Sequence, residues 1–383
     1  MNVIVVGAGL AGLGAAIGLA QDGHEVTVME RAAEMEAVGA GISIWPNALR
    51  ALEELGVADD VQRVGVPFAS TEIRDRRGRS LNKLDPGVVL KRLGRQPLMV
   101  HRAELQSLLL HAACEADVQL GAAVVAARTS ATGAVVELAD GMRLDADLVV
   151  GADGARSAIR RVLDPSPPRV AGPVAWRAVV SSSVVVEDAW LSVADGHQFL
   201  ATPMTNGRVY VSGLVDVQDA AVPHDELLLR SVYAGWHEPI PQLLASVTDV
   251  DIRWDQVLHR FAPRRMYAGR VVLIGDAAHP MTPDLGQGGC QAMEDAVLLA
   301  SALRHASSID AALARFERLR RPRVRRVVNE SRRIGTALAL RNPTAVRMRD
   351  ASMRVIPQSA ALTQLARNAS VRSFERQLTA SAA

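Results

Sequence analysis

Residues 1–30 of this 383-residue chain constrain its fold more than any other stretch. Val3–Val6 is a short run of β-branched residues, which predicts a buried β-strand. A glycine-rich turn and an apolar helical segment reaching Asp22 follow, and Val26–Met29 predicts a second strand. This order of strand, turn, helix and strand is the β-α-β unit of dinucleotide-binding domains. We therefore expect an α/β fold with a Rossmann-like domain at this end of the chain.

The glycine spacing assigns a role to each position of the turn. Gly7 permits the tight turn, Gly9 lets the backbone approach a pyrophosphate, and Gly12 lets helix and strand pack closely. The pyrophosphate then lies on the helix N-terminus at Leu10 and Ala11, where unpaired N–H groups and the helix dipole favour an anion.

An acid ends the second strand. Glu30, with Arg31 beside it, lies 18 residues past Gly12, where a carboxylate can accept hydrogen bonds from a ribose. A carboxylate there favours an unphosphorylated ribose, as in FAD or NAD. The motif alone leaves both cofactors open.

Two later segments have related patterns. Leu148–Gly151 predicts a strand, and a tight turn containing Asp153 follows it. Val271–Ile274 predicts another strand, which ends near Asp276. The glycine-rich loop Pro283–Gly289 then leads into an expected helix from about Cys290 to Ala302.

Taken with the N-terminal unit, these segments resemble the three signatures of the class A flavoprotein monooxygenases, the family of para-hydroxybenzoate hydroxylase, salicylate hydroxylase and the FAD-dependent urate hydroxylases. Gly39–Ala48 and His101–Leu105 also look like family segments, and the resemblance covers most of residues 1–330. It implies FAD as cofactor and NADH or NADPH as a transient reductant. It also implies hydroxylation of an aromatic or heteroaromatic small molecule with O2, through a flavin C4a-hydroperoxide.

The resemblance assigns roles around the flavin. Arg102 is expected to reach the cofactor, and Asp153 belongs to a turn that contacts FAD and the nicotinamide cofactor. Asp276 is expected to accept from ribityl or ribose hydroxyls, and Pro283 to lie beside the reactive face of the flavin. The expected cofactor-binding set is Gly7, Gly9, Leu10, Ala11, Gly12, Glu30, Arg31, Arg102, Asp153, Asp276, Pro283, Gly286, Gln287, Gly288 and Gly289.

Each polar member of this set also has a purely structural interpretation. Asp153 and Asp276 could form turns or cap helices, Arg102 could form a surface ion pair, and Asp284 could cap the turn at Gly286.

The middle of the chain offers candidates for the substrate pocket. A phenolic substrate becomes more reactive when deprotonated, and a base with a near-neutral pKa suits that step. We expect His197, Tyr210 and Pro283 to act in catalysis. We expect Arg177, Gln198 and Tyr210 to bind substrate, since arginine can bind a carboxylate with two hydrogen bonds.

Three of these assignments carry alternatives. Gln198 stands where urate-type relatives would have an arginine, which argues against urate as substrate. His197 could be an exposed turn residue, and Tyr210 could belong to the sheet core. Trp176, next to Arg177, is expected to serve core packing.

The chain divides into segments of different pattern. Val179–Val186, Gln198–Thr202 and Arg208–Val215 are rich in valine, serine and threonine, which predicts antiparallel strands. We expect a mixed α/β and α+β architecture: a Rossmann-like FAD-binding domain with an inserted antiparallel-sheet substrate domain and C-terminal helices. The expected boundaries are 1–70, 98–170 and 262–340 for the FAD-binding domain, 71–97 and 171–261 for the substrate-binding sheet domain, and 341–383 for the helical tail.

A long helix is expected over residues 310–340, with a break or kink at Pro322. Eight arginines lie between Arg318 and Arg333. They could face an acidic partner or a membrane surface, but a solvated helix face is the favoured interpretation. The tail over residues 343–383 is expected to pack on the body or to mediate a dimer.

Composition excludes several classes of function. The net charge of +2 gives no electrostatic case for nucleic acid, and the irregular apolar spacing of the tail argues against a membrane role. Cys114 and Cys290 form neither a disulfide framework nor a metal site, so we expect no metal and a reducing, cytoplasmic compartment. The expected partners are a small aromatic substrate and O2, and the expected assembly is a monomer or homodimer.

Two alternative functions remain open from the residues. An FAD-dependent epoxidase or another flavin oxidoreductase would use the same cofactor cradle. A flavin-binding sensor without oxygenase turnover would account for the arginine-rich helix.

Overall fold

Strand β1 (Asn2–Val6) lies inside a six-stranded sheet, between β12 (Leu148–Gly151) and β2 (Glu25–Met29), and is parallel to both. Val3 and Val5 are fully buried, as parallel strands covered on both faces require. The expected Rossmann-like unit is therefore present. The outer strands are β8 (Asp117–Gln119), β19 (Val271–Leu273) and β18 (Tyr267–Ala268).

The computed structural model describes residues 1–35, 40–69, 71–130, 132–216, 224–261 and 263–382. Gly39, one of the residues in the family-like segment, lies outside these residues. So do residues 70 and 262, at which two of the expected domain boundaries fall.

Helix α1 (Leu10–Gln21) packs closely against α9 (Gly288–His305) beside this sheet. The close approach depends on small residues. A Cβ at Gly14 or Gly18 would lie 3.1 or 3.0 Å from an alanine Cβ of α9. The glycines of this segment therefore do more than form the first turn, because they also bring two helix N-termini together.

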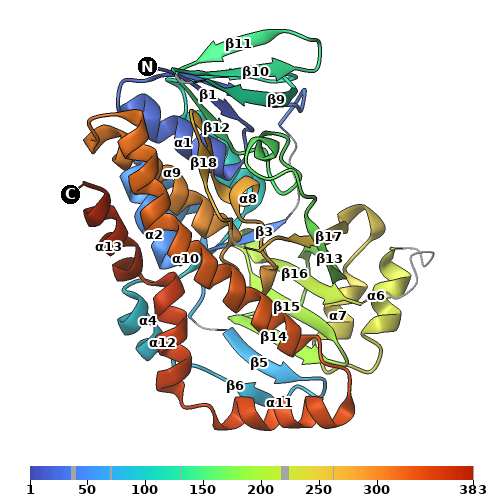
Figure 1. Cartoon of the computed structure of the whole chain (residues 1–383). Coiled ribbons are helices and arrows are strands. Elements are labelled where there is room, and N and C mark those ends of the chain that lie inside the picture. Colours follow the sequence, from blue (N-terminus) through green and yellow to red (C-terminus); the bar gives the residue numbers. More distant parts are fainter. Residues whose placement is uncertain (36–39, 70, 131, 217–223, 262, 383) are drawn as a thin grey trace.

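A seven-stranded sheet forms the second layer of the molecule (Figure 1). Its strands come from two separate stretches of the chain. One pair, β5 with β14, is parallel, and the other pairs are antiparallel. In sheet order the strands are β17 (Arg253–His259), β13 (Arg169–Ser181), β16 (Arg208–Val215), β15 (His197–Pro203), β14 (Ala189–Ala194), β5 (Thr71–Asp75) and β6 (Ser80–Asn82).

Side chains alternate between the two faces of this sheet. On one face, Trp176, Phe199 and Tyr233 form a buried aromatic cluster beneath α6 (Glu226–Val232) and α7 (Ile240–Ala245). The opposite face is directed toward the first layer, and we call it the inner face.

Two three-stranded sheets and further helices complete the described part of the chain. The small sheets contain β9 (Val124–Thr129), β10 (Ala134–Leu138) and β11 (Arg143–Ala146), and β3 (Gly41–Ile44), β7 (Leu98–His101) and β4 (Val66–Pro67). The other helices before residue 300 are α2 (Pro46–Glu54), α3 (Ala58–Val64), α4 (Pro86–Leu93), α5 (Arg102–Ala112) and α8 (Gly275–Ala278), with 3-10 turns η1 (Ile159–Val162), η2 (Thr205–Gly207), η3 (Asp249–Asp251) and η4 (Pro283–Leu285).

Helix α10 (Ile309–Leu338) passes both layers and continues through Pro322. Of the expected break or kink at that proline, the break is therefore wrong, and the kink stays a prediction. The expectation of a solvated arginine face is also wrong in part, because Arg320 and Arg323 are buried. Their guanidinium groups bind acids on α9, which provides the counter-charges that buried arginine needs.

The tail forms α11 (Pro343–Val355), α12 (Gln358–Ala369) and α13 (Val371–Ala382). Phe374 of α13 is fully buried in the main core, so the expected packing of the tail on the body is confirmed. Among the described residues, no helix is both long enough and apolar enough to span a bilayer.

Candidate active site

The turn after β1 has the geometry of a pyrophosphate cradle. Gly7 has a φ of +103°, and a Cβ at Gly12 would lie 1.8 Å from the Gly7 carbonyl oxygen. Both positions therefore require glycine. A Cβ at Gly9, in contrast, would meet no atom within 4 Å, so open space lies over the start of α1. That space is where a dinucleotide phosphate would approach the backbone.

Two helix N-termini converge at this place. Gly289, in the first turn of α9, would bring a Cβ to 3.5 Å from the Leu10 side chain in the first turn of α1. Neither helix has a side-chain cap, so their first N–H groups remain available to an anionic ligand. Ala11 is packed in the same place, where a Cβ on Gly275 would approach to 2.8 Å.

Glu30 joins the end of β2 to this turn. Its carboxylate accepts hydrogen bonds from the Ala8 N–H at 2.8 Å and from the Ala32 N–H at 2.9 Å. The carboxylate is held in place and keeps free lone pairs for ribose hydroxyls. Arg31 is exposed next to it.

Helix α5 borders the cradle. Arg102 is its first residue and its side chain is exposed, with the backbone N–H bound to the Ala40 carbonyl at 2.8 Å. One turn later, the Gln106 amide donates to the Ala8 carbonyl at 2.9 Å. Gln106 therefore holds the glycine-rich turn, a role that the sequence did not indicate.

Asp153 has the contacts of a turn-forming residue. Its carboxylate accepts from the Ser157 hydroxyl at 2.5 Å and from the Ala158 and Ile159 N–H groups at 2.7 and 3.2 Å. These bonds hold the loop after β12 in place. The residue before Asp153, Ala152, packs directly against the Gly7 backbone. Any contact from Asp153 to a cofactor would be in addition to these bonds.

Asp276 lies in α8, directly after β19. Asp276 is exposed at its outer edge. The protein packed around its carboxyl nevertheless limits solvation of the charge and so raises the pKa of Asp276. Electrostatic interactions with His279, Arg102 and Arg177 oppose this rise in pKa, and these three residues come from three separate segments of the chain.

The loop between α8 and α9 approaches the inner face of the seven-stranded sheet. Pro283 and Gly286 are exposed, and Gly286 is left-handed with a φ of +60°. Gly288 begins α9 with open space at its Cβ position. Gln287 is buried, and its side-chain oxygen accepts from Asn47 at 3.1 Å, so its side chain points into the protein. A cofactor contact at Gln287 would use its backbone.

The strand register places three expected substrate residues on the inner face. Gln198 is paired with Leu214, Tyr210 with Val179, and Ser212 with Arg177. Alternation therefore directs Arg177, Gln198 and Tyr210 to the same side of the sheet. His197, next to Gln198, is directed to the other side.

The local contacts of His197 agree with this placement. Its Nδ1 accepts from the Asp216 N–H at 3.4 Å. Burial lowers the pKa of His197, and Arg341 lowers it further, against the opposing charges of Asp216 and Asp195. His197 therefore lies at the end of the β14–β15 hairpin, and its side chain is not on the inner face that carries Gln198. Trp176 is fully buried and donates to the Tyr233 hydroxyl at 2.9 Å, which confirms its core-packing role.

Gln198 and Asp284 connect the sheet to the loop at Pro283. The Gln198 side-chain amide donates to Asp284 Oδ1 at 3.1 Å. Burial raises the pKa of Asp284, while hydrogen bonds from Thr282 and Gln198 oppose that rise. A half-buried carboxyl with a raised pKa keeps its proton to higher pH than an exposed one and is a stronger base when ionised.

Tyr210 lies against the chain of the first layer. A Cβ at Gly41 would approach the Tyr210 ring to 2.5 Å, so the ring rests on the β3 backbone. Burial raises the pKa of Tyr210, with Arg177 and a hydrogen bond involving Ser212 opposing the rise. The phenol is therefore neutral at neutral pH, so its hydroxyl is able to donate a hydrogen bond.

Arg177 already has a carboxylate partner. Its guanidinium lies 2.9 Å from Asp255 Oδ2 on the neighbouring strand β17. The Arg177 side chain is 27% exposed, so this ion pair is open to exchange with a ligand carboxylate.

A buried charge network stabilises the segment between β19 and α9. Asp295 of α9 accepts from the Gly275 N–H at 2.8 Å and from Arg320 at 2.6 Å, and it contacts His279 at 2.6 Å. Burial alone would raise the pKa of Asp295, but His279 and Arg320 outweigh it and hold that pKa at about 2. Glu294 binds Arg320 and Arg323 in the same way. The inward-facing arginines of α10, spaced three residues apart, were the signal for this network.

In the described part of the chain, no group of three or more His, Cys, Asp or Glu residues could hold a metal ion. Cys290 is buried and Cys114 is exposed, and neither forms a disulfide.

Comparison with known proteins agrees with the geometry. Residues 1–331 match the model of the FAD binding domain family. The aurachin C monooxygenase/isomerase of Stigmatella aurantiaca is 36% identical over 363 residues, which are 93% of this chain and 94% of that protein. The FAD-dependent urate hydroxylase of Klebsiella pneumoniae is 37% identical over 344 residues, 87% of this chain and 89% of that protein.

A solved structure supports the same relation. Klebsiella pneumoniae HpxO, complexed with FAD and uric acid, superposes with a TM-score of 0.88 at 30% identity, covering 98% of this chain and 97% of that one. The open space over Gly9, the two uncapped helix N-termini and the carboxylate of Glu30 all fit FAD. The chain therefore belongs to the FAD binding domain family, with FAD as its cofactor.

Proposed function

We propose that this protein is an FAD-dependent monooxygenase that uses NADH or NADPH and O2 to hydroxylate an aromatic or heteroaromatic small molecule. The observation that carries the proposal is the Gln198–Asp284 hydrogen bond, which joins the inner face of the sheet to the loop at Pro283. The monooxygenase names of the relatives support the reaction class.

The chain's own residues have separable roles in this proposal. Bound FAD supplies the electron transfer and oxygen chemistry. Asp284 receives a proton from the substrate hydroxyl, and Gln198 orients its carboxyl. Tyr210, being neutral, donates a hydrogen bond to a substrate oxygen. Arg177 binds a substrate carboxylate by exchange with Asp255.

Water is excluded by an apolar wall beside Tyr210. Phe68, Met99 and Met204 are buried around it, and Leu200 packs against them from the inner face. Such a wall keeps bulk water away from the site and strengthens each polar contact inside it.

Pro283 is proposed to border the reacting ring, because it is exposed next to Asp284. His197 is a weaker candidate for the base than Asp284, since alternation directs it away from Gln198. A base role for His197 would need the end of the β14–β15 hairpin to turn toward the flavin.

The side chain at position 198 limits which class of substrate the site can bind. Its amide is neutral and its donor group is engaged with Asp284. An anionic purine would find no guanidinium at this position, so we infer an aromatic acid or phenol and not urate. Arg177 then serves as the charged group that distinguishes acids from neutral phenols.

We also infer the domain division from the sheets. Residues 71–97 and 171–261 would form the substrate-binding domain, residues 1–70, 98–170 and 262–340 the FAD-binding domain, and residues 341–383 a helical tail. A monomer or homodimer in a reducing cytoplasm is the proposed assembly and compartment, and light scattering of the purified protein tests the assembly.

The experiment that tests the function is a panel of aromatic acids, phenols and N-heterocycles. Each compound is scored for stimulated NAD(P)H oxidation by the FAD-loaded protein. Products are identified after reaction under 18O2, because uncoupled turnover makes peroxide without labelled product. Labelled hydroxylated product supports the proposal, an epoxide identifies the alternative reaction, and no stimulation by any class contradicts both.

A further inference from the structure

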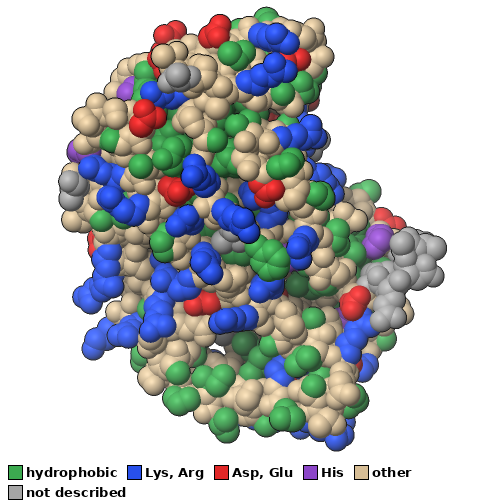
Figure 2. Space-filling model, in the orientation of Figure 1, with side chains coloured by type: hydrophobic (Ala, Val, Ile, Leu, Met, Phe, Trp, Pro, Cys, Tyr) green, Lys and Arg blue, Asp and Glu red, His purple; other side chains and the backbone are tan. Residues whose placement is uncertain are grey.

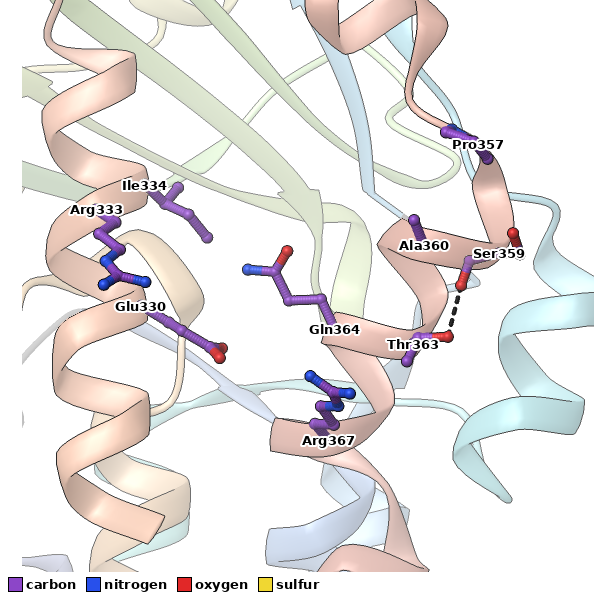
Figure 3. Close-up of a pocket in the computed structure, with 9 residues that line it drawn as sticks. All are labelled: Glu330, Arg333, Ile334, Pro357, Ser359, Ala360, Thr363, Gln364 and Arg367. Carbon is purple, nitrogen blue, oxygen red and sulfur yellow. Dashed lines mark hydrogen bonds between the residues drawn. The ribbon is translucent and has the colours of Figure 1, made fainter. Parts of the chain in front are cut away.

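A second concave region lies outside the site described above. A pocket of about 600 Å³ separates α10 from α12, and Figure 2 shows a hollow at this position. The size falls in the range of small-molecule sites, roughly 300–1,000 Å³. In Figure 3, Ile334, Gln364 and Arg367 lie around the space between the two helices, and strands pass behind it.

One wall of this pocket continues to the inner face of the sheet. Ile334 lines the pocket and also packs in an apolar cluster with Leu338, Leu191 and Val193. Leu191 pairs with Leu200, and Val193 pairs with Gln198, so both belong to the inner face. This apolar cluster, in which Ile334 and Leu191 are only half-buried, therefore lies between the pocket and the strands that carry the proposed substrate residues.

The same turns of α10 also hold the loop at Pro283. The Ser331 hydroxyl donates to the Thr282 carbonyl at 2.7 Å, and a Cβ at Gly335 would lie 2.4 Å from Asp284 Oδ2. Ser331 and Gly335 neighbour the pocket residues Glu330 and Ile334 in sequence. One helix thus separates the pocket from the proposed proton acceptor.

The rim of the pocket is positively charged. Arg333 and Arg367 are exposed there, and within the described ranges neither guanidinium has a carboxylate partner. Glu330, the acid in the lining, accepts a hydrogen bond from the Asn368 amide at 2.5 Å. With two guanidinium groups and one carboxylate, the lining has a net positive charge, and such a cleft attracts anionic ligands.

We propose that the α10–α12 pocket is the entrance through which an anionic aromatic substrate reaches the inner face, with Arg333 and Arg367 attracting its carboxylate. The proposal rests on the proposed function for the identity of the substrate. The entrance itself is a property of the fold and is testable without a substrate.

The test uses two small quenchers of bound FAD fluorescence, anionic iodide and neutral acrylamide, on the FAD-loaded protein. Arg333→Glu combined with Arg367→Glu reverses the charge of the rim. We expect the iodide quenching constant to fall by roughly threefold or more at low salt, with recovery at high salt and no change for acrylamide. Arg128→Glu, an exposed change on β9 at the far end of the molecule, is the matched control and should leave both constants unchanged.

Variants that narrow the pocket distinguish the effect of access to the flavin from the effect of the charge at the rim. Ala360→Trp and Gln364→Trp add bulk at two exposed lining positions, and each should lower quenching by iodide and acrylamide together. Unchanged quenching in both tryptophan variants overturns the entrance. Reduced quenching in them with no effect of charge reversal overturns the role of the arginines. If no aromatic compound stimulates NAD(P)H oxidation, the proposed function fails, while this test still decides the entrance.

Discussion

Gln198 Nε2 lies 3.1 Å from Asp284 Oδ1, and this hydrogen bond connects two residues that are 86 positions apart in the sequence. It joins strand β15 of the seven-stranded sheet to the η4 turn before α9. The contact places a carboxyl of elevated pKa between the inner face of the sheet and the loop at Pro283. In the proposed function, a proton acceptor at this junction serves both parts of the site.

The pH dependence of turnover tests the role of Asp284. Burial raises its pKa, so kcat/KM should decline as the pH falls through that raised pKa, because the protonated carboxyl cannot accept a proton. Gln198→Leu removes a hydrogen bond that favours the ionised form. The acidic limb of the kcat/KM profile should therefore move to higher pH.

Two further variants complete that measurement. Asp284→Asn should remove the acidic limb and lower kcat by about 100-fold or more. Gln242→Leu, an exposed change on α7, should leave the limb in place. An acidic limb that survives in Asp284→Asn assigns it to another group.

Two glycine substitutions separate folding from cofactor binding. Gly12→Ala places a Cβ 1.8 Å from the Gly7 carbonyl and should lower the Tm of the apoprotein together with FAD affinity. Gly9→Ala meets no protein atom within 4 Å, so its methyl group should weaken FAD binding with little change in apoprotein Tm. FAD titration and thermal unfolding check both, and an equal loss of Tm in the two variants would contradict the assignment of Gly9.

Acid stability should depend on Asp295. Its pKa in the folded state is held at about 2, below the ordinary value of 3.8, so the ionised carboxylate stabilises the fold above pH 3.8. That contribution is lost as the pH falls through 3.8 toward about 2. Asp295→Asn should lower the free energy of unfolding at pH 7 by roughly 3 kcal/mol, because Arg320 loses a buried partner.

Urea unfolding at pH 7 and at pH 3 measures this effect. The variant should lose much less stability than the natural protein between the two pH values. Asp145→Asn, an exposed change on β11, is the control and should behave like the natural protein. Parallel losses in all three proteins would place the acid sensitivity elsewhere.

The ion pair between Arg177 and Asp255 predicts opposite effects from its two partners. Arg177→Gln should raise KM for aromatic acids by about tenfold or more and change KM for neutral phenols little. Asp255→Asn should lower KM for the acids, because it frees the guanidinium at 2.9 Å. Steady-state kinetics on matched acid and phenol pairs checks both. The same change in KM for both ligand classes would exclude a carboxylate-binding role.

The cofactor half of the site could be predicted because its signals are local. Gly7, Gly9 and Gly12 define a turn whose geometry depends on adjacent residues alone, and Glu30 follows at the spacing that one β-α-β unit imposes. The family match over residues 1–331 confirms the FAD interpretation.

The substrate half required tertiary information. The residue pattern predicted strands that contain Gln198 and Tyr210, and the structure confirms them as β15 and β16. The sequence could not decide which side of each strand faces the flavin, since that depends on what packs against the sheet. His197 and Gln198 are adjacent in sequence, yet they point to opposite faces.

The sequence by itself determined a Rossmann-like cradle for a dinucleotide, because short-range geometry restricts a glycine-rich turn between strand and helix to few structures. Tertiary structure decided the partners across long separations: Gln198 with Asp284, Arg177 with Asp255, and Arg320 with Asp295. Charged and amide side chains have many possible partners along a chain. Only the folded backbone brings one of them within hydrogen-bond distance and removes the water that would otherwise compete.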